Sequence, residues 1–155
     1  METDRYEEVY SLNFKFAEYL NHSGKIDPDV SKRVAYYLWQ TGRTKEADFY
    51  FDQVIKYDQE SIKLGRFGTI EKRTQFDLAE VYALIGNKEK AYYYLDEVNT
   101  NQSFPWYWIV QFKHEPFFDP IRQEPRFQKI LKDVETKYQA EHDQLGKWLK
   151  EQRLL

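Results

Sequence analysis

The stretch VAYYLWQTGRTKEADFYF, residues 34–51, returns in altered form as LAEVYALIGNKEKAYYYL, residues 78–95. Each copy places an alanine near its start, a glycine in its middle and a second alanine after the glycine. In the first copy these are Ala35, Gly42 and Ala47, and the second copy keeps the same offsets. Self-similarity at a period of roughly 20–50 residues is typical of stacked helix pairs. The repeat therefore predicts an all-α protein built from helical hairpins.

The alanines and glycines have a physical reason to recur. Two antiparallel helices approach closely only where side chains are small, so we expect Ala35 to face Ala47 and Ala79 to face Ala91. The glycine of each copy stands where the chain must leave its first helix in a left-handed conformation, which glycine tolerates best.

Helical spacing of apolar residues, together with glycine and proline positions, predicts the other boundaries. Asp27-Pro28 and Thr69 are helix starts, Gly65 and Gly68 break the preceding helix, and Gly146 indicates a bend or frayed end in a long last helix. We expect one domain without strands, in four parts: an N-terminal helix (1–24), a first repeat (28–65), a second repeat (69–100) and capping helices (104–155).

Composition argues against nucleic-acid binding, a membrane span and a secretory signal. The 155 residues carry a formal net charge of -3 with basic and acidic residues well mixed, so no basic field indicates nucleic-acid binding. No apolar run approaches the roughly 18 residues that span a membrane, and the first residues, Met1-Glu2-Thr3-Asp4, do not resemble a secretory signal. We therefore expect a cytoplasmic protein that binds neither nucleic acid nor membrane.

Catalytic and metal signatures are weak. The chain has no cysteine, which excludes disulfides, thiolate nucleophiles and cysteine-type zinc sites. His22, His114 and His142 lie far apart, and no Ser/His/Asp order or phosphate-binding loop is legible. We expect no enzyme, no metal and no cofactor.

The order small, aromatic, glycine, small, aromatic resembles the tetratricopeptide repeat (TPR). The second copy shows it best, with Ala79, Tyr82, Gly86 and Ala91, and with Leu95 in the last aromatic place. The first copy has leucine where the first aromatic is usual, and the period exceeds the usual length of about 34 residues. The resemblance implies a right-handed array of antiparallel helix pairs.

A second segment strengthens the resemblance. KHEPFFDPIRQEPRF, residues 113–127, is similar to the closing segment of many bacterial TPR proteins. That similarity implies a non-catalytic protein–protein interaction scaffold, in the manner of the regulatory C-terminal module of a larger bacterial signalling or transcription-control protein.

In TPR arrays the first helix of each repeat lines a peptide-binding groove. Tyr36 occupies the place of the asparagine that a chaperone-type carboxylate clamp requires, so the resemblance does not imply that clamp. Basic residues beside aromatic ones suit a protein or peptide partner. An alternative is that the N-terminal helix fills the groove. The groove candidates are Lys32, Tyr36, Trp39, Arg73, Phe76 and Glu80.

The densest apolar cluster, residues 104–110, contains Trp106 and Trp108. It is either an interface or a short helix that caps the open end of the array. With the long last helix, the cluster supports an alternative function, a structural self-assembly module that forms a homodimer.

Overall fold

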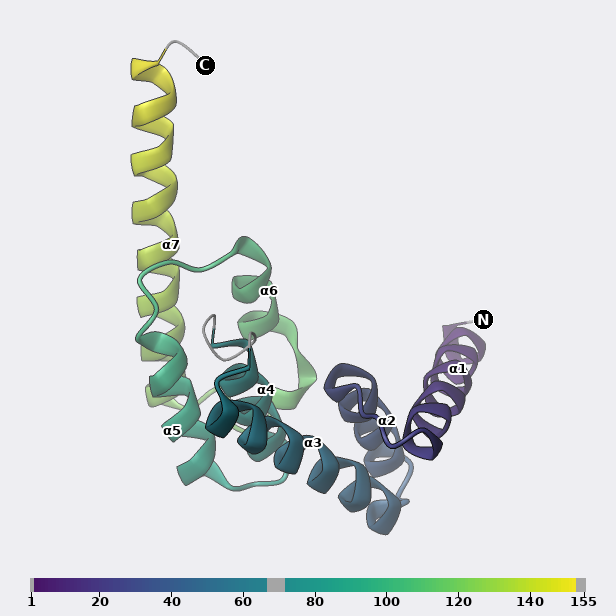
Figure 1. Cartoon of the computed structure of the whole chain (residues 1–155). Helices are drawn as coiled ribbons and strands as arrows, with labels where there is room; N and C mark the ends of the chain where they lie inside the picture. The colour runs from purple at the N-terminus through teal and green to yellow at the C-terminus, as the bar shows by residue number, and fades with distance from the viewer. Residues whose placement is uncertain (1, 67–71, 153–155) are drawn as a thin grey trace. The chain divides into compact units, whose positions relative to one another are not determined.

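The computed structural model describes residues 2–66 and 72–152, and these residues form helices and turns without any strand (Figure 1). The predicted all-α class is therefore confirmed. The chain divides into two compact units, Met1–Val81 and Tyr82–Leu155, and α4 contributes residues to both. The elements are α1 (Glu2–His22), α2 (Pro28–Gln40), α3 (Thr44–Leu64), α4 (Arg73–Leu84), α5 (Lys88–Asn99), α6 (Trp106–His114), the 3-10 helix η2 (Pro116–Phe118) and α7 (Pro125–Glu151).

The first unit is organised around the hairpin of α2 and α3, and α1 packs against α2. Helix α2 starts as the sequence predicts: the Asp27 side chain accepts a hydrogen bond from the Val30 amide at 3.1 Å, and Pro28 occupies the first turn. Ala35 and Ala47 are fully buried. Small side chains at both positions let the two helix backbones approach closely.

The turn after α2 and the turn after α4 have the same geometry. Gly42 has φ 79° and Gly86 has φ 82°. At the first turn the Arg43 amide donates to the Leu38 carbonyl at 2.8 Å, and the equivalent bond of the second turn measures 2.9 Å. This is the six-residue closure of a helix end that a left-handed residue permits. The two copies of the sequence repeat thus share the backbone geometry of this turn.

Other predicted boundaries have mixed outcomes. Gly65 ends α3 in the left-handed conformation, as predicted. The predicted break at Gly68 and cap at Thr69 lie outside the described residues, and α4 begins at Arg73. Gly146 was predicted to bend the last helix or fray its end, and α7 continues as helix through Gly146 to Glu151.

Aromatic packing forms the core of the second unit. The rings of Phe112 and Phe118 stack with centroids 5.8 Å apart, and Phe118 lies 5.2 Å from Phe127. All three side chains are fully buried. They come from α6, η2 and α7, so the proline-rich segment folds these three elements onto one aromatic centre.

Arg122 holds the proline-rich turn together. Its guanidinium donates to the Phe112 carbonyl at 2.5 Å, to the Glu115 carbonyl, and to the Asp119 carboxylate at 2.8 Å. Two of these acceptors are backbone carbonyls at the end of α6, where a helix leaves carbonyls without intrahelical partners. The segment that is similar to TPR proteins, residues 113–127, is therefore stabilised by its own arginine.

Polar contacts connect α5 to the start of α7. The Tyr92 hydroxyl donates to Glu124 at 2.7 Å, Lys88 pairs with the same carboxylate at 2.5 Å, and Arg126 pairs with Asp96 at 2.7 Å. Burial and the hydrogen bond to Glu124 raise the pKa of Tyr92. Beyond these contacts, the C-terminal half of α7 projects past α5 and α6 (Figure 1).

Candidate functional site

A buried cluster of charged side chains lies in the first unit, between α2 and α4. The Lys32 side chain is 3% exposed, and its ammonium pairs with Asp77 at 2.7 Å and with Glu80. Arg73 binds Asp29 at 2.9 Å and lies 3.2 Å from Asp77. Burial alone disfavours the ammonium, but Glu80 and Asp77 outweigh that effect and raise the pKa of Lys32. Lys32 is therefore a fixed positive charge.

A further buried carboxyl, Asp58 of α3, belongs to this charged cluster. Burial and then the charge on Asp77 raise the pKa of Asp58 to about 8. Lys32 and Arg73 act in the opposite direction, but too weakly to keep the pKa of the carboxyl in its ordinary range. Asp58 is accordingly neutral at pH 7.

The structure brings four of the six groove candidates together, three in the charged cluster and Phe76 beside it. Lys32, Arg73 and Glu80 share the charged cluster, where their charges are neutralised by the chain's own groups. Phe76 is fully buried, and the Arg73 guanidinium lies 5.8 Å from its ring.

The remaining two groove candidates lie near the surface of α2. Tyr36 and Trp39 have ring centroids 6.5 Å apart, and Trp39 is exposed. The N-terminal helix does reach α2, but through a different tyrosine: Tyr10 stacks on Tyr37 with a centroid distance of 3.5 Å.

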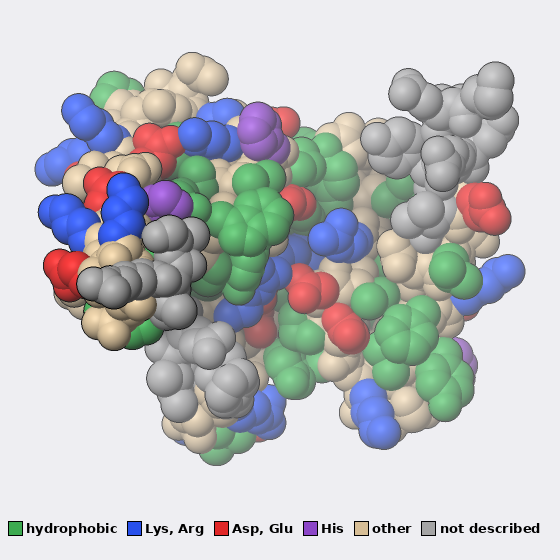
Figure 2. Space-filling view, turned by 90° about the horizontal axis from the view of Figure 1, so that it is seen from above, with side chains coloured by type: hydrophobic (Ala, Val, Ile, Leu, Met, Phe, Trp, Pro, Cys, Tyr) green, Lys and Arg blue, Asp and Glu red, His purple; other side chains and the backbone are tan. Residues whose placement is uncertain are grey.

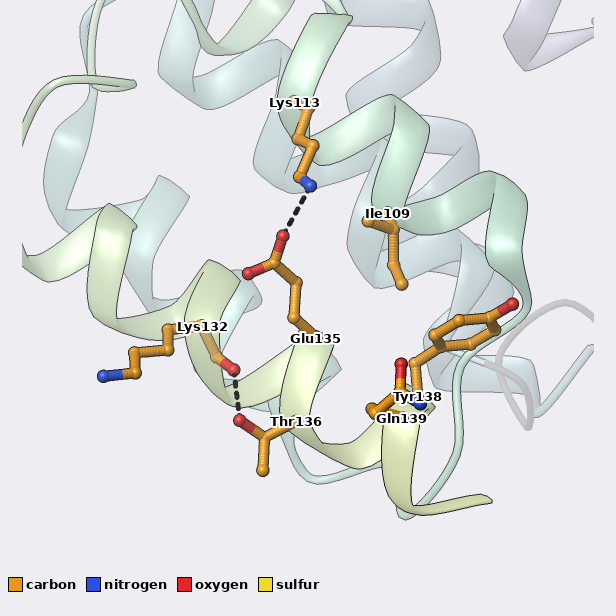
Figure 3. A pocket seen from close by; sticks show the side chains of 7 residues that line it. All are labelled: Ile109, Lys113, Lys132, Glu135, Thr136, Tyr138 and Gln139. Carbon is orange, nitrogen blue, oxygen red and sulfur yellow. Dashed lines mark hydrogen bonds and ion pairs between the residues drawn. The ribbon is translucent and has the colours of Figure 1, made fainter. Parts of the chain in front are cut away.

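A shallow groove of about 470 Å³ runs between α6 and α7 in the second unit (Figure 3). Ile109 and Tyr138 line its apolar part. Lys113 of α6 and Glu135 of α7 point toward each other and pair at 2.6 Å. Lys132 adds a second exposed cation on the α7 side. The groove therefore offers an apolar floor with more positive than negative charge around it.

The two interface candidates lie in contrasting environments. Trp106 is 65% exposed, whereas Trp108 is 2% exposed and packs 5.7 Å from the Phe104 ring. Tyr107 and Val110 of α6 are also exposed. Only Trp106 is available to a partner, while Trp108 belongs to the core of the second unit.

Two residues of the charged cluster, Asp58 and Asp77, were not predicted, although the sequence contains a signal for each. Asp58 lies in the stripe Ala47, Phe51, Val54, Asp58 and Ser61, which has helical spacing and is buried throughout. A carboxylate on an apolar helix face needs a partner or a proton. The same argument applies to Asp77, one turn before Glu80 on α4.

Metal sites and membrane-spanning helices are not found in the described ranges. There, no three histidine, cysteine or acidic side chains are grouped so that they could hold a metal ion. None of the helices in those ranges combines the length and the apolar composition that crossing a membrane requires. On the face shown in Figure 2, basic and acidic side chains are interspersed with hydrophobic ones.

Comparisons with protein families, with curated proteins and with solved structures gave no match to this chain.

Proposed function

We propose that this chain is a non-catalytic protein–protein interaction module with a TPR-like arrangement of its helix pairs, working in the cytoplasm. The observation that carries the proposal is the α6–α7 groove beside the exposed aromatic side chains of α6. Trp106, Tyr107 and Val110 expose apolar surface to solvent next to a groove that is already formed. Exposed apolar side chains gathered beside a concave surface are typical of interaction sites.

The chemistry of the groove selects one kind of partner. Ile109 and Tyr138 suit an apolar side chain, and Lys113 and Lys132 suit a carboxylate nearby. We propose a short amphipathic segment of another protein, with an acidic residue within one helical turn of an aliphatic one. The charged cluster of the first unit is a poorer candidate, because its charges already bind one another.

Selection from a displayed peptide library tests this proposal. The bait is the full chain, and Lys132→Glu and Lys147→Glu are the comparison baits; both lysines are exposed on α7, but only Lys132 lines the groove. We expect acidic–aliphatic peptides that bind the parent and Lys147→Glu about equally and bind Lys132→Glu at least tenfold more weakly. Exchanging the acidic residue of a peptide for lysine should restore its binding to Lys132→Glu. Peptides that bind all three baits equally would contradict the proposal.

A second candidate function, self-assembly, is favoured by the apolar stripe of α7. Its first part, with Phe127, Ile130 and Val134, is buried, while Leu145 and Trp148 continue it on the exposed C-terminal half. Light scattering over a dilution series tests this alternative. A dimer that Leu145→Glu/Trp148→Glu dissociates with helicity intact would support it, and a monomer at every concentration would exclude it.

A further inference from the structure

The carboxyl of Asp58 is buried without a complete set of partners. Its side chain is 2% exposed, and among the described residues nothing forms a hydrogen bond with Oδ2. The hydroxyl of Ser61, three residues later on the same buried helix face, donates to the Tyr57 carbonyl at 2.8 Å and accepts from Arg66 at 3.1 Å. An ionised carboxylate in this position would lose its hydration without replacement.

The cations near Asp58 are already bound to other carboxylates. Lys32 pairs with Asp77 and Glu80, and Arg73 pairs with Asp29 and Asp77. In these ion pairs among the described residues, three carboxylates share the two cations, and ionised Asp58 would be a fourth. The charged groups around it come from two helices, Asp29 and Lys32 from α2, and Arg73, Asp77 and Glu80 from α4.

We propose that Asp58 is the trigger of a proton-sensitive latch. With its carboxyl protonated, the C-terminal half of α3 stays packed beside the charged cluster. Loss of the proton in mildly alkaline solution forces the carboxylate either to draw in water or to break an existing ion pair, and both loosen this part of α3. The latch reports pH and is independent of the proposed binding groove, which lies in the other unit.

The direction of the pH dependence follows from proton linkage. The pKa of Asp58 in the folded chain is raised to about 8 from its ordinary value of 3.8. Between these two pH values the folded chain holds a proton that the unfolded chain has released. The stability of the folded state therefore decreases as pH rises through this window, and the decrease is complete above about pH 8.

Carbon-detected NMR of the full chain tests the latch directly. The measurement follows the side-chain carboxyl carbon of Asp58 from pH 5 to 10, together with the backbone carbonyl carbons of residues 59–64. We expect the carboxyl to titrate with a midpoint near 8 and the α3 backbone signals to shift with the same midpoint, reversibly. A midpoint in the ordinary acidic range would overturn the proposal. An alkaline midpoint with unmoved backbone signals would also overturn it.

A pair of variants on α3 gives an independent test. Asp58→Asn keeps the shape of the protonated carboxyl but has no proton to lose, while Asp52→Asn makes the same change at an exposed position. Between pH 6 and 9 we expect the Tm of the parent and of Asp52→Asn to fall by roughly 5–10 °C. The Tm of Asp58→Asn should lack this fall. An equal fall in all three proteins would refute the latch, and if Asp58→Asn does not fold, the carbon titration of the parent decides.

Discussion

At the scale of single residues, glycine has two different uses in this chain. Gly42 has φ 79°, a conformation that costs a residue with a side chain roughly 1–2 kcal/mol. Gly146 lies inside α7 with a helical backbone, where glycine is roughly 0.5–1 kcal/mol less favourable than alanine. Apart from the adjoining backbone, no described atom lies within 4 Å of the place that a Cβ would take at either glycine, so backbone conformation decides each outcome.

The same substitution should therefore have opposite effects at these two sites. We expect Gly42→Ala to lower the free energy of unfolding by about 1–2 kcal/mol and Gly146→Ala to raise it by about 0.5–1 kcal/mol. Urea denaturation followed by circular dichroism measures both values. Destabilisation by Gly146→Ala would mean that α7 is not continuous through that residue.

The residue scale also shows what could be predicted from sequence and why the rest could not. Gly42 and Gly86 were predictable because a left-handed helix end depends on local sequence alone. Asp58 is different: the charges that act on it, Lys32 and Asp77, come from other helices, and their approach depends on tertiary packing. The sequence shows a polar residue in an apolar stripe, but it does not show which charges lie opposite.

At the scale of helices, Lys32 joins α2 to α4 through two buried carboxylates. Replacing it by methionine removes the buried cation that pairs with Asp77 and Glu80, and breaking a buried ion pair typically costs about 3–5 kcal/mol. The neighbouring Arg33 is exposed, so Arg33→Met should change stability by less than about 0.5 kcal/mol. Chemical denaturation of both variants checks this. Equal small effects would show that the α2–α4 ion pairs contribute nothing.

Arg122 has a comparable role in the turn between α6 and α7. We expect Arg122→Ala to cost about 2–3 kcal/mol, because two backbone carbonyls lose a charged donor. Arg126 is a suitable control, since its pair with Asp96 is largely exposed and typically worth under about 1 kcal/mol. A thermal-melting comparison of Arg122→Ala with Arg126→Ala decides. If the two variants melt alike, the carbonyl contacts of Arg122 are not stabilising.

Helix boundaries were largely predictable because their signals are local. Asp27-Pro28 starts α2 and Gly65 ends α3 as expected. Helix α7 is not interrupted at Gly146, because one glycine lowers helix stability without blocking any backbone hydrogen bond. The role of Arg122 was not predictable, since this turn residue binds the carbonyls of Phe112 and Glu115, which lie ten and seven positions earlier in the chain.

At the scale of the whole molecule, the site residues fall into two groups with different accessibility. Most groove candidates of the first unit are buried or paired, whereas α6 of the second unit exposes the aromatic side chains of Trp106 and Tyr107. The resemblance to TPR arrays predicted a site on α2 and α4. A resemblance transfers sequence positions from a family, but it does not show whether the side chains at these positions are buried. Which of these side chains are accessible depends on how each helix packs against its neighbours.

The two tryptophans of α6 differ in burial, so their substitutions should differ in effect. A double substitution of Trp106 and Trp108 would confuse loss of an interface with loss of the core, since Trp108 is 2% exposed. We expect Trp108→Ala to cost about 3–5 kcal/mol in unfolding free energy, and Trp106→Ala, at a 65% exposed side chain, to leave the melting temperature unchanged.

Light scattering of Trp106→Ala distinguishes partner binding from self-assembly, and it avoids the loss of stability that a change at Trp108 would cause. If the chain is an interaction module for other proteins, parent and variant are both monomers across the dilution series, and only partner binding is lost. If the chain is a self-assembly module that uses α6, the parent is a dimer and Trp106→Ala dissociates it while it remains folded. Dissociation with intact helicity would show that the exposed α6 surface is a homodimer interface and not a site for another protein.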